Sequence, residues 1–385
     1  MPSIILPENG ALVPFQLSPP GQFTVASQPV PRIAYAAAHV VADPLAEQDP
    51  WLDTRIDWDR TIAFRKYLWS LGLGVAEAMD TAQRGAGLNW NSARQLIELS
   101  LAAMRDVPGA IMGAGAGTDH LAPGPDVTVD DVIRAYEEQC EAVEAMGGRI
   151  ILMASRALAK AAKGPSDYEH VYGRILGQVR QPVIIHWLGD MFDPMLEGYW
   201  GSADIGAAME VALGVIAANA KKVDGIKVSL LDDASEIAMR RRLSRAVRMY
   251  TGDDFNFVEL IAGDSEGYSN ALLGIFDPIA PAAAGALAAL SHNDLSTYHG
   301  ILAATVPLAR HMFRAPTQFY KTGVVFMAWL NGHQDHFVMV GGQQSARSIQ
   351  HFAELFRLAS RAGLLRDPDF AAARMRTLLV LQGVL

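Results

Sequence analysis

Short apolar runs alternate with helical patterns along most of the chain, and this alternation restricts the possible folds more than any other feature. Eight runs of strand length are each followed by a segment with apolar residues at helical spacing. The expected strands span residues 32–41, 74–79, 110–115, 149–153, 181–187, 223–233, 255–261 and 285–290. Apolar runs without polar alternation are typical of parallel strands that are covered on both faces. Eight such units predict an α/β protein with a (β/α)8 TIM barrel.

The chain extends beyond the expected barrel at both ends. Residues 1–32 are punctuated by prolines and predict an N-terminal arm or hairpin. The barrel is expected over residues 33–294, and residues 295–385 are expected to form a C-terminal helical extension that includes the last barrel helix. Helical periodicity predicts helices at residues 57–71, 91–104, 128–146, 167–179, 203–221, 234–250, 268–275, 296–313, 320–331 and 345–362.

The composition argues against several classes of protein. With 50% apolar and 19% charged residues, the chain has the make-up of a globular protein with an ample core. A net charge of -9 without a basic block argues against nucleic acid or a membrane surface as a partner. The single cysteine, Cys140, excludes an internal disulfide and a cysteine-based metal motif. The N-terminus lacks the pattern of a signal peptide, and we expect a cytoplasmic location.

Lys227 is the one charged side chain in the middle of the expected sixth strand, between Asp224 near its start and Asp232 and Asp233 at its end. A buried ammonium group costs free energy unless it is paired or neutral. Burial lowers the pKa of a lysine, and a neutral amine is a nucleophile toward carbonyl carbons. The strand alone leaves two other interpretations open, a lysine that turns outward and a lysine in a structural ion pair.

Polar side chains gather where the expected strands end, which in a barrel is the face that carries the active site. These residues are His39, Asp43, Asp80, Thr81, Asp119, His120, Ser155, Arg156, His186, Trp187, Lys227, Ser229, Glu259, Asp264, His292 and Asp294. Some have simpler interpretations, His39 and His292 as core histidines, and Asp43 and Asp294 as helix caps. Glu259 interrupts an apolar run and requires a partner, for which Lys227 on the neighbouring strand is the nearest candidate.

Three motifs fall on expected strands of the barrel. Gly225-Ile226-Lys227 lies on the sixth strand, a proline-led segment ending in His186 lies on the fifth, and the glycine-rich run 113–118 lies on the third. With the order of elements over about residues 30–330, they resemble the class I aldolase family of dihydrodipicolinate synthase and N-acetylneuraminate lyase. In that family the lysine of Gly-Ile-Lys forms a Schiff base with a 2-oxo acid. The resemblance implies the same role for Lys227, with no cofactor besides the lysine imine, in a divergent branch of the family.

Two family motifs are changed in this chain. The family's second-strand loop, Gly-Thr-Thr-Gly-Glu, grips the substrate carboxylate, whereas residues 80–85 read Asp-Thr-Ala-Gln-Arg-Gly and keep one hydroxyl, that of Thr81. The family's fourth strand ends in a tyrosine that relays protons, and residues 153–156 contain no tyrosine. The resemblance therefore implies an altered site, in which His186, Ser155 or Glu259 takes over proton transfer.

The leading hypothesis is a Schiff-base lyase, an aldolase or dehydratase, that acts on a 2-oxo acid, sugar acid or keto-sugar. Lys227 is the expected nucleophile, His186 the first choice for acid-base work, and Glu259 a group that tunes the lysine or moves protons. Arg84 or Arg156 is expected to hold a carboxylate. The other expected substrate contacts are Asp80, Thr81, Ser155, Ser229, Asp264 and His292. The acidic loop of Asp264 and Glu266 would repel phosphate, so an unphosphorylated substrate is predicted.

Two alternatives belong to other classes. A metal-dependent barrel isomerase or aldolase would bind a divalent ion through residues among His39, His120, His186, Glu259, Asp264 and His292. A non-catalytic barrel would bind a sugar or a protein partner. Under the leading hypothesis no metal is needed, the partner is a small-molecule substrate, and the chain is expected to form a homo-oligomer.

Overall fold

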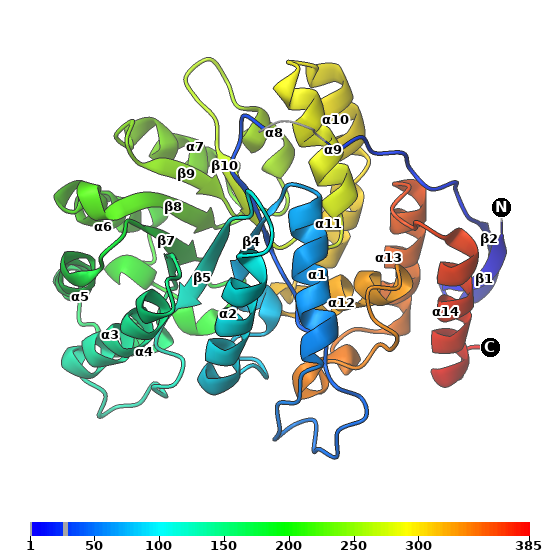
Figure 1. Ribbon diagram of the computed structural model, residues 1–385, viewed down its shortest axis with the longest axis horizontal. Helices are drawn as coiled ribbons and strands as arrows, with labels where there is room; N and C mark the ends of the chain where they lie inside the picture. The colour runs from blue at the N-terminus through cyan, green and yellow to red at the C-terminus, as the bar shows by residue number, and fades with distance from the viewer. Residues whose placement is uncertain (1, 26–29) are drawn as a thin grey trace.

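The computed structural model describes residues 2–25 and 30–385, and a closed barrel of parallel strands forms its centre (Figure 1). The strands follow one another around the barrel in chain order. They are β3 (Ala34–Ala37), β4 (Gly74–Glu77), β5 (Met112–Ala116), β6 (Ile150–Leu152), β7 (Val183–Leu188), β8 (Val223–Ser229), β9 (Arg248–Thr251) and β10 (Asn270–Leu273). Pairing of β10 with β3 closes the ring. The predicted (β/α)8 TIM barrel is confirmed.

Helices surround the barrel and cover the outer face of its strands (Figure 1). They are α1 (Trp58–Ser70), α2 (Trp90–Met104), α3 (Val129–Ala145), α4 (Arg156–Ala161), α5 (Pro165–Gln178), α6 (Ile205–Ala218), α7 (Asp233–Arg242), α8 (Phe257–Ala262) and α9 (Ala280–Ser291). Side-chain caps fix where several of them begin. Asp57 accepts a hydrogen bond from the Arg60 N–H, and Thr128 and Asp131 form a reciprocal capping box.

The predictions for the seventh and eighth strands are wrong. Residues 257–261 belong to α8 and residues 285–290 to α9. The two strands are β9, which overlaps the end of the helix expected over 234–250, and β10, which lies inside the helix expected over 268–275. Both strands have only four residues, too few to show a period of their own. The α9 residues are nearly all buried, so the helix lacks the polar face that marks a helix in a sequence.

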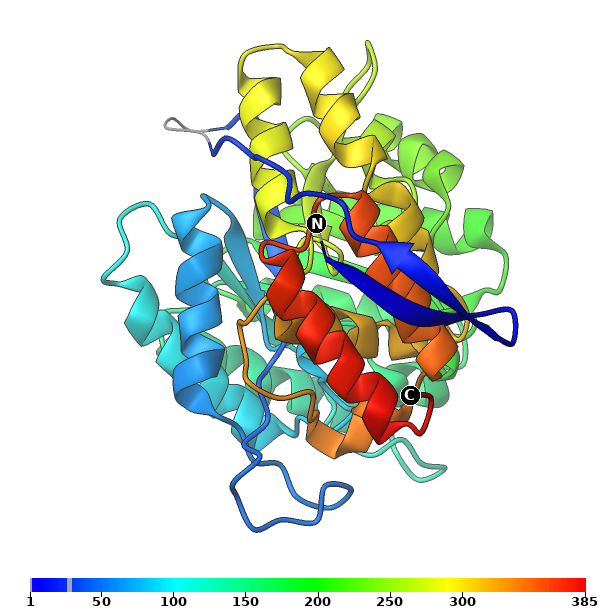
Figure 2. The same ribbon diagram turned by 90° about the vertical axis from the view of Figure 1, so that its right-hand side faces the viewer.

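The two ends of the chain lie together on one side of the barrel (Figure 2). The antiparallel hairpin of β1 (Ser3–Glu8) and β2 (Ala11–Gln16) packs against α13 (Ile349–Arg361) and α14 (Pro368–Leu381). Arg357 Nη2 donates a hydrogen bond to the Pro7 carbonyl at 3.0 Å. Residues 1 and 26–29 of the expected arm lie outside the described residues.

The helices after the barrel include α10 (Leu295–Ala303), α11 (Val306–Met312) and α12 (Tyr320–Leu330). Every residue of α12 is buried, and the helix packs on the short turn Asp80–Ala82 that follows β4. Since the carboxyl ends of the strands carry the active site in this fold, α12 reaches the functional face from outside the barrel.

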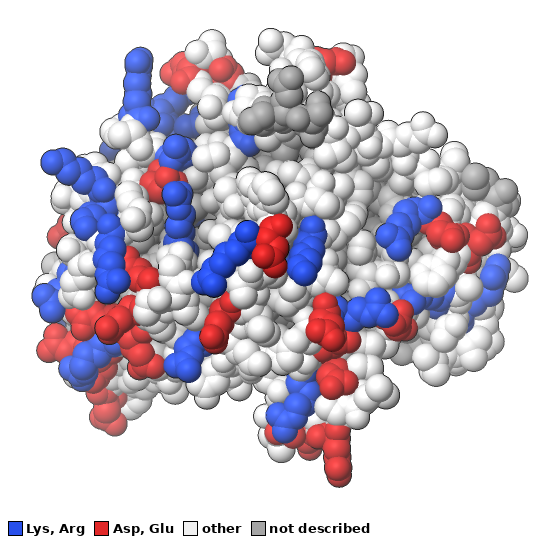
Figure 3. Space-filling view, in the orientation of Figure 1, with Lys and Arg blue, Asp and Glu red and all other residues white. Residues whose placement is uncertain are grey.

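The surface gives no single-signed charge field on the face seen in Figure 3. Lysine and arginine side chains are interspersed with aspartate and glutamate across this face, including its centre. Within the described ranges, no single helix has both the length and the apolar character to cross a membrane. One pair bent by 64°, Pro194–Gly201 with Ile205–Ala218, meets the requirements of length and composition.

Candidate active site

Lys227 lies on β8, the sixth strand of the barrel, as predicted. The residue is buried, with 6% of its surface exposed. Gly252, directly after β9, makes room for the side chain, because a Cβ atom at this position would lie 2.7 Å from Lys227 Cε. The Lys227 Nζ forms no hydrogen bond and no ion pair with any residue between 2 and 25 or between 30 and 385. The site thus contains a buried amine to which no described residue is hydrogen-bonded.

His186 is the partner of Lys227 in register on the adjacent strand β7. Its Nε2 lies 3.2 Å from Ser229 Oγ, and its Nδ1 lies 3.9 Å from a carboxylate oxygen of Asp80. Burial, and then the charge of Lys227, hold the pKa of His186 well below its ordinary value. The imidazole is therefore neutral at physiological pH, with one nitrogen able to accept a proton and the other able to donate one.

The charges of two carboxylates influence the pKa of Lys227. Burial lowers the pKa of Lys227, and this effect outweighs the charges of Asp80 and Asp254, which raise it. Asp254 follows β9, is 3% exposed, and accepts a hydrogen bond from the Ile275 N–H at 2.8 Å. Burial raises the pKa of Asp254 to about 7. The charges of the buried amine and of this carboxyl group thus influence each other, and Asp254 can change its protonation state near neutral pH.

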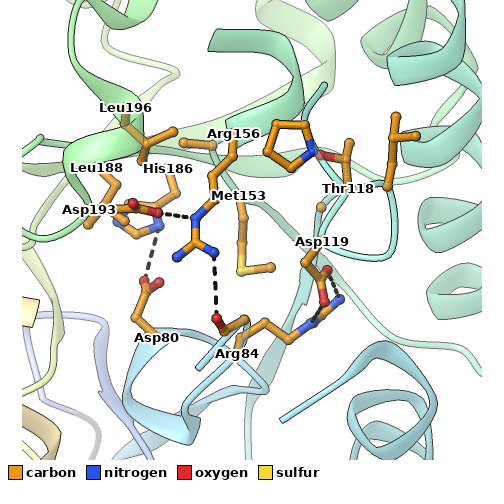
Figure 4. A pocket seen from close by; sticks show the side chains of 15 residues that line it. Asp80, Arg84, Thr118, Asp119, Met153, Arg156, His186, Leu188, Asp193 and Leu196 are labelled. Carbon is orange, nitrogen blue, oxygen red and sulfur yellow. Dashed lines mark hydrogen bonds and ion pairs between the residues drawn. The ribbon is translucent and has the colours of Figure 1, made fainter. Parts of the chain in front are cut away.

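A pocket of about 620 Å³, open solvent included, lies at the carboxyl ends of β4 to β7 (Figure 4). We call it the mouth pocket. Its lining consists of Asp80, Arg84, Gly85, Gly117, Thr118, Asp119, Leu121, Pro123, Met153, Ala154, Arg156, His186, Leu188, Asp193 and Leu196. Lys227 does not line the pocket itself, but His186 and Asp80 do, and in Figure 4 these two side chains point toward each other. His186 connects the pocket to the lysine, because it lines the pocket and is the register partner of Lys227.

Arg84 is held inside the pocket wall by its own hydrogen bonds. Its Nε and Nη2 donate to the two carboxylate oxygens of Asp119 at 2.8 and 2.7 Å. Its Nη1 donates to the Ala78 and Gly115 carbonyls, and Nη2 also donates to Gln139 Oε1. With these donors engaged, Arg84 braces the ends of β4 and β5 and has little left for a substrate carboxylate.

Arg156 is placed differently. Its Nε donates to Asp193 at 2.5 Å, and 40% of its side chain is exposed. Figure 4 shows its guanidinium extending across the pocket between Asp193 and the Gly85 carbonyl, from which Nη1 is 3.5 Å. The remaining N–H groups can form hydrogen bonds to a carboxylate in the pocket.

The hydroxyl groups expected at the site, those of Ser155, Ser229 and Thr81, form hydrogen bonds with different partners. Ser155 Oγ accepts the Leu158 N–H at the start of α4 and lies 2.5 Å from Thr118 Oγ1, so it organises the end of β6. Ser229 contacts His186, as described above. Thr81 Oγ1 lies 2.8 Å from the hydroxyl of Tyr320, the first residue of α12.

The structure does not bring Glu259, Asp264 and His292 to the mouth. Glu259 lies on α8, where 76% of its side chain is exposed and its carboxylate is 3.4 Å from His299. The predicted pairing of Glu259 with Lys227 on a neighbouring strand is therefore wrong. Asp264 follows α8 and pairs with Arg240 at 2.9 Å.

His292 is exposed at the last turn of α9. Since α8 and α9 run away from the carboxyl ends of their strands, Asp264 and His292 lie beyond the far ends of these helices. The phosphate-repelling loop expected from Asp264 and Glu266 is likewise not at the site. All three misplacements follow from the wrong seventh and eighth strands.

The residues proposed for a metal site lie apart. His39 Nδ1 is 2.7 Å from Asp277, with both side chains buried. His120 contacts Gln139 at 2.7 Å and Glu138 at 3.3 Å. Nowhere in the described part of the chain do three His, Cys, Asp or Glu side chains gather as metal ligands would.

Sequence reasoning missed Asp254, Tyr320 and Lys321. Lys321 is 8% exposed, its Nζ donates to the Gln318 carbonyl at 3.1 Å, and burial lowers its pKa while Asp80 and Asp193 raise it. A lysine inside an apolar helix is the same signal that singled out Lys227. For Asp254 the signal was hidden, because the strand it follows was not predicted.

A family model described as "Protein of unknown function (DUF993)" matches residues 4–384. The chain belongs to the DUF993 family. No curated protein matches this DUF993 chain.

Solved structures share the fold of the DUF993 chain at low sequence identity. A chloride-inhibited dihydrodipicolinate synthase from Acinetobacter baumannii in complex with pyruvate is 14% identical, with a TM-score of 0.63 over 86% of this chain and 99% of the other. The enzyme from Thermotoga maritima is 14% identical, with a TM-score of 0.61 over 87% and 99%. The enzyme from Aquifex aeolicus is 10% identical, with a TM-score of 0.60 over 92% and 98%. The DUF993 chain thus has the dihydrodipicolinate synthase fold, as the resemblance implied.

Proposed function

We propose that this DUF993 protein is a Schiff-base-forming lyase in which Lys227 attacks the ketone of a 2-oxo acid, sugar acid or keto-sugar. The observation that carries the proposal is the Lys227 amine on the sixth strand, which is buried, forms no hydrogen bond to any described residue, and lies in register with His186 on the fifth strand. A buried lysine of this kind destabilises a fold, and nucleophilic catalysis is a reason to keep one. The fold shared with dihydrodipicolinate synthases supports the same reaction class.

The reaction begins with a neutral amine. Burial lowers the pKa of Lys227, so the uncharged form is present at a pH where a surface lysine would be protonated. Attack on the carbonyl carbon gives a carbinolamine, and loss of water gives a protonated imine. The imine withdraws electrons from the adjacent carbon, which allows a carbon-carbon or carbon-oxygen bond to break.

Neighbouring groups supply protons. Asp254, with a pKa of about 7, donates or accepts a proton at little cost near neutral pH. His186 is neutral and hydrogen-bonded to Ser229, so it is suited to accept a proton from substrate that enters past Asp80. Glu259, which was expected in this role, is replaced by Asp254 in the proposal.

Arg156 is the proposed carboxylate ligand. Its exposed guanidinium extends over the mouth pocket. A positive charge at this place favours an anionic substrate such as a 2-oxo acid. A homo-oligomeric state stays a prediction, which the elution volume of the purified chain tests.

The proposed function is tested by measuring whether the protein turns over a compound in a mixture of candidate substrates. The full chain is incubated with a pool of 2-oxo acids, sugar acids and keto-sugars, and the pool is followed by mass spectrometry. The expected result is cleavage or dehydration of one component, absent in K227M and retained in K222M, in which a lysine that binds the Val179 carbonyl is lost instead. Equal turnover in K227M and the unchanged chain would contradict the proposal.

A further inference from the structure

The C-terminal extension contributes a phenol to the barrel. Tyr320, the first residue of α12, is 4% exposed, and its hydroxyl lies 2.8 Å from Thr81 Oγ1. Thr81 belongs to the turn that follows β4, directly after Asp80. The hydrogen bond therefore ties a helix from outside the barrel to the carboxyl end of its second strand.

The ring of Tyr320 is tightly placed at the end of the eighth strand. It stacks on Phe313 with ring centroids 4.3 Å apart and meets Phe192 edge-on at 6.1 Å. A Cβ atom at Gly274, directly after β10, would lie 3.1 Å from Tyr320 Cε2. The next residue, Ile275, donates its N–H to Asp254. The phenol thus lies between Thr81 on one side and the backbone that holds Asp254 on the other.

Tyr320 and Lys227 share the same two carboxylate neighbours. The charges of Asp80 and Asp254 act on the amine of Lys227 and also on the phenol of Tyr320. Burial, followed by these charges, raises the pKa of Tyr320 well above its ordinary value. The phenol therefore keeps its proton at neutral pH, and it can give that proton only to a strong base such as an alkoxide.

The tyrosines behind the fourth strand are engaged elsewhere. The Tyr136 hydroxyl donates to the Met153 carbonyl at 2.6 Å, and the Tyr199 hydroxyl accepts the Ser155 N–H at 3.0 Å and contacts Tyr172. These hydroxyl groups stabilise the end of β6. Among the described residues, Tyr320 has one hydrogen-bond partner, the Thr81 hydroxyl, and a second hydrogen-bonding position on the phenol oxygen is left for a substrate.

We infer that Tyr320 is a catalytic residue of the lysine chemistry, which donates a proton to the substrate oxygen as the carbinolamine forms. The inference rests on the proposed function. The Lys227 nitrogen forms the carbon-nitrogen bond, the carbonyl π pair moves to oxygen, and the oxygen takes the phenol proton. The phenolate recovers a proton from the nitrogen, which has become positively charged. The Asp254 carboxyl then protonates the hydroxyl, water leaves, and the nitrogen lone pair forms the imine.

The inference makes the C-terminal extension part of the active site. The chain lacks a tyrosine at the end of its fourth strand, and α12 brings a phenol to the turn that follows β4 from another direction. Thr81, the hydroxyl kept in the altered loop 80–85, positions this phenol.

The test compares Y320F with Y172F in the full chain. Pyruvate is the probe, sodium cyanoborohydride traps the imine, and intact mass measures both the rate of adduct formation and its final yield. For Y320F we expect adduct formation to slow by about 10²- to 10⁴-fold, as for loss of a general acid, with adduct still accumulating on Lys227. Y172F removes a buried hydroxyl of the same type behind β6 and is expected to react at the unchanged rate.

The outcomes separate the two proposals. Equal trapping rates in Y320F and the unchanged chain would overturn the role of Tyr320 and leave the lysine chemistry standing. The same slowing in Y320F and Y172F would mean that only packing was disturbed, and would also overturn it. No adduct in the unchanged chain would overturn the lysine chemistry and the role of Tyr320 together.

Discussion

Lys227 and His186 face each other in register on β8 and β7, and burial holds the pKa of both side chains below the ordinary value. Two basic groups are therefore kept neutral side by side at the end of the barrel. Each would destabilise its neighbour if both were charged. The relationship leads to predictions about stability as well as chemistry.

Replacing Lys227 with methionine is expected to stabilise the protein. Burial makes Lys227 lose its proton more easily in the folded state than in the unfolded chain. Because the unfolded chain binds more protons, the free energy of unfolding rises with pH until the ordinary lysine pKa near 10.5 is reached. At neutral pH we expect K227M to gain about 1–3 kcal/mol, with the gain shrinking toward pH 10.5. Urea unfolding at several pH values measures this, and a destabilised K227M would contradict the described burial.

The protonation of Asp254 changes the stability of the fold with pH in the opposite direction to that of Lys227. Its pKa of about 7 lies above the unfolded value of 3.8, so the folded state binds the extra proton and stability falls as pH rises from 4 to 7. The neutral isostere in D254N should remove this loss. Because one pH unit in pKa corresponds to about 1.4 kcal/mol, we expect a gain on the order of 2–4 kcal/mol above pH 7. Thermal unfolding scans at pH 5 and pH 8 test this, and an equal effect at both pH values would refute it.

Glu236 is a buried carboxyl group outside the site, and it serves as a control for Asp254. Burial raises its pKa to about 8, and its Oε1 accepts a hydrogen bond from Ser269 at 2.6 Å. E236Q is expected to be increasingly more stable than the unchanged chain from pH 4.5 to pH 8, for the same reason as D254N. Trapping of a 2-oxo acid on Lys227 should be unaffected by E236Q, and a loss of trapping would show that the two acidic groups are not independent.

The buried pair of Arg65 and Glu77 supports the strand that leads to Asp80. Arg65 Nε and Nη2 donate to the two carboxylate oxygens at 2.9 and 2.8 Å, and Ser100 donates at 2.6 Å. Removing one charge leaves the other buried and unpaired, so R65M is expected to lose about 3–5 kcal/mol of unfolding free energy. Denaturant unfolding measures the loss, and a change below about 1 kcal/mol would contradict the pairing.

The two arginines of the mouth pocket should respond differently. Arg156 has N–H groups facing the pocket, whereas those of Arg84 are engaged by Asp119, Gln139 and two carbonyls. R156M is therefore expected to raise the substrate concentration needed for half-maximal trapping by about tenfold or more with little change in stability, and R84M to destabilise the fold. The reverse pattern in paired titration and melting experiments would assign the substrate carboxylate to Arg84.

Most of the barrel was predictable because six of its strands are apolar runs flanked by helices with clear caps and periodicity. Lys227 and His186 were predictable for the same reason, since a polar group within an apolar run requires an explanation. The short β9 and β10 and the wholly buried α9 lack such local signals. That failure displaced Glu259, Asp264 and His292 and concealed Asp254.

Tyr320 and Lys321 could not be placed from the sequence at all. Their position depends on how α12 packs on the Asp80–Ala82 turn, more than 230 residues earlier in the chain, which no local pattern records. Arg84 illustrates the converse case. Its residue type suits carboxylate binding, but the partners that engage it come from β4, β5 and α3, which meet only in the folded barrel.

The most direct test of the account is to locate the covalent adduct. The full chain is incubated with 2-oxo acids and keto-sugars, reduced with borohydride, digested and mapped by mass spectrometry, with K227M and K222M in parallel. We predict a mass increase on the peptide that contains Lys227, absent in K227M and present in K222M. An adduct confined to other lysines, or none with any compound, would contradict the assignment of Lys227 as the nucleophile.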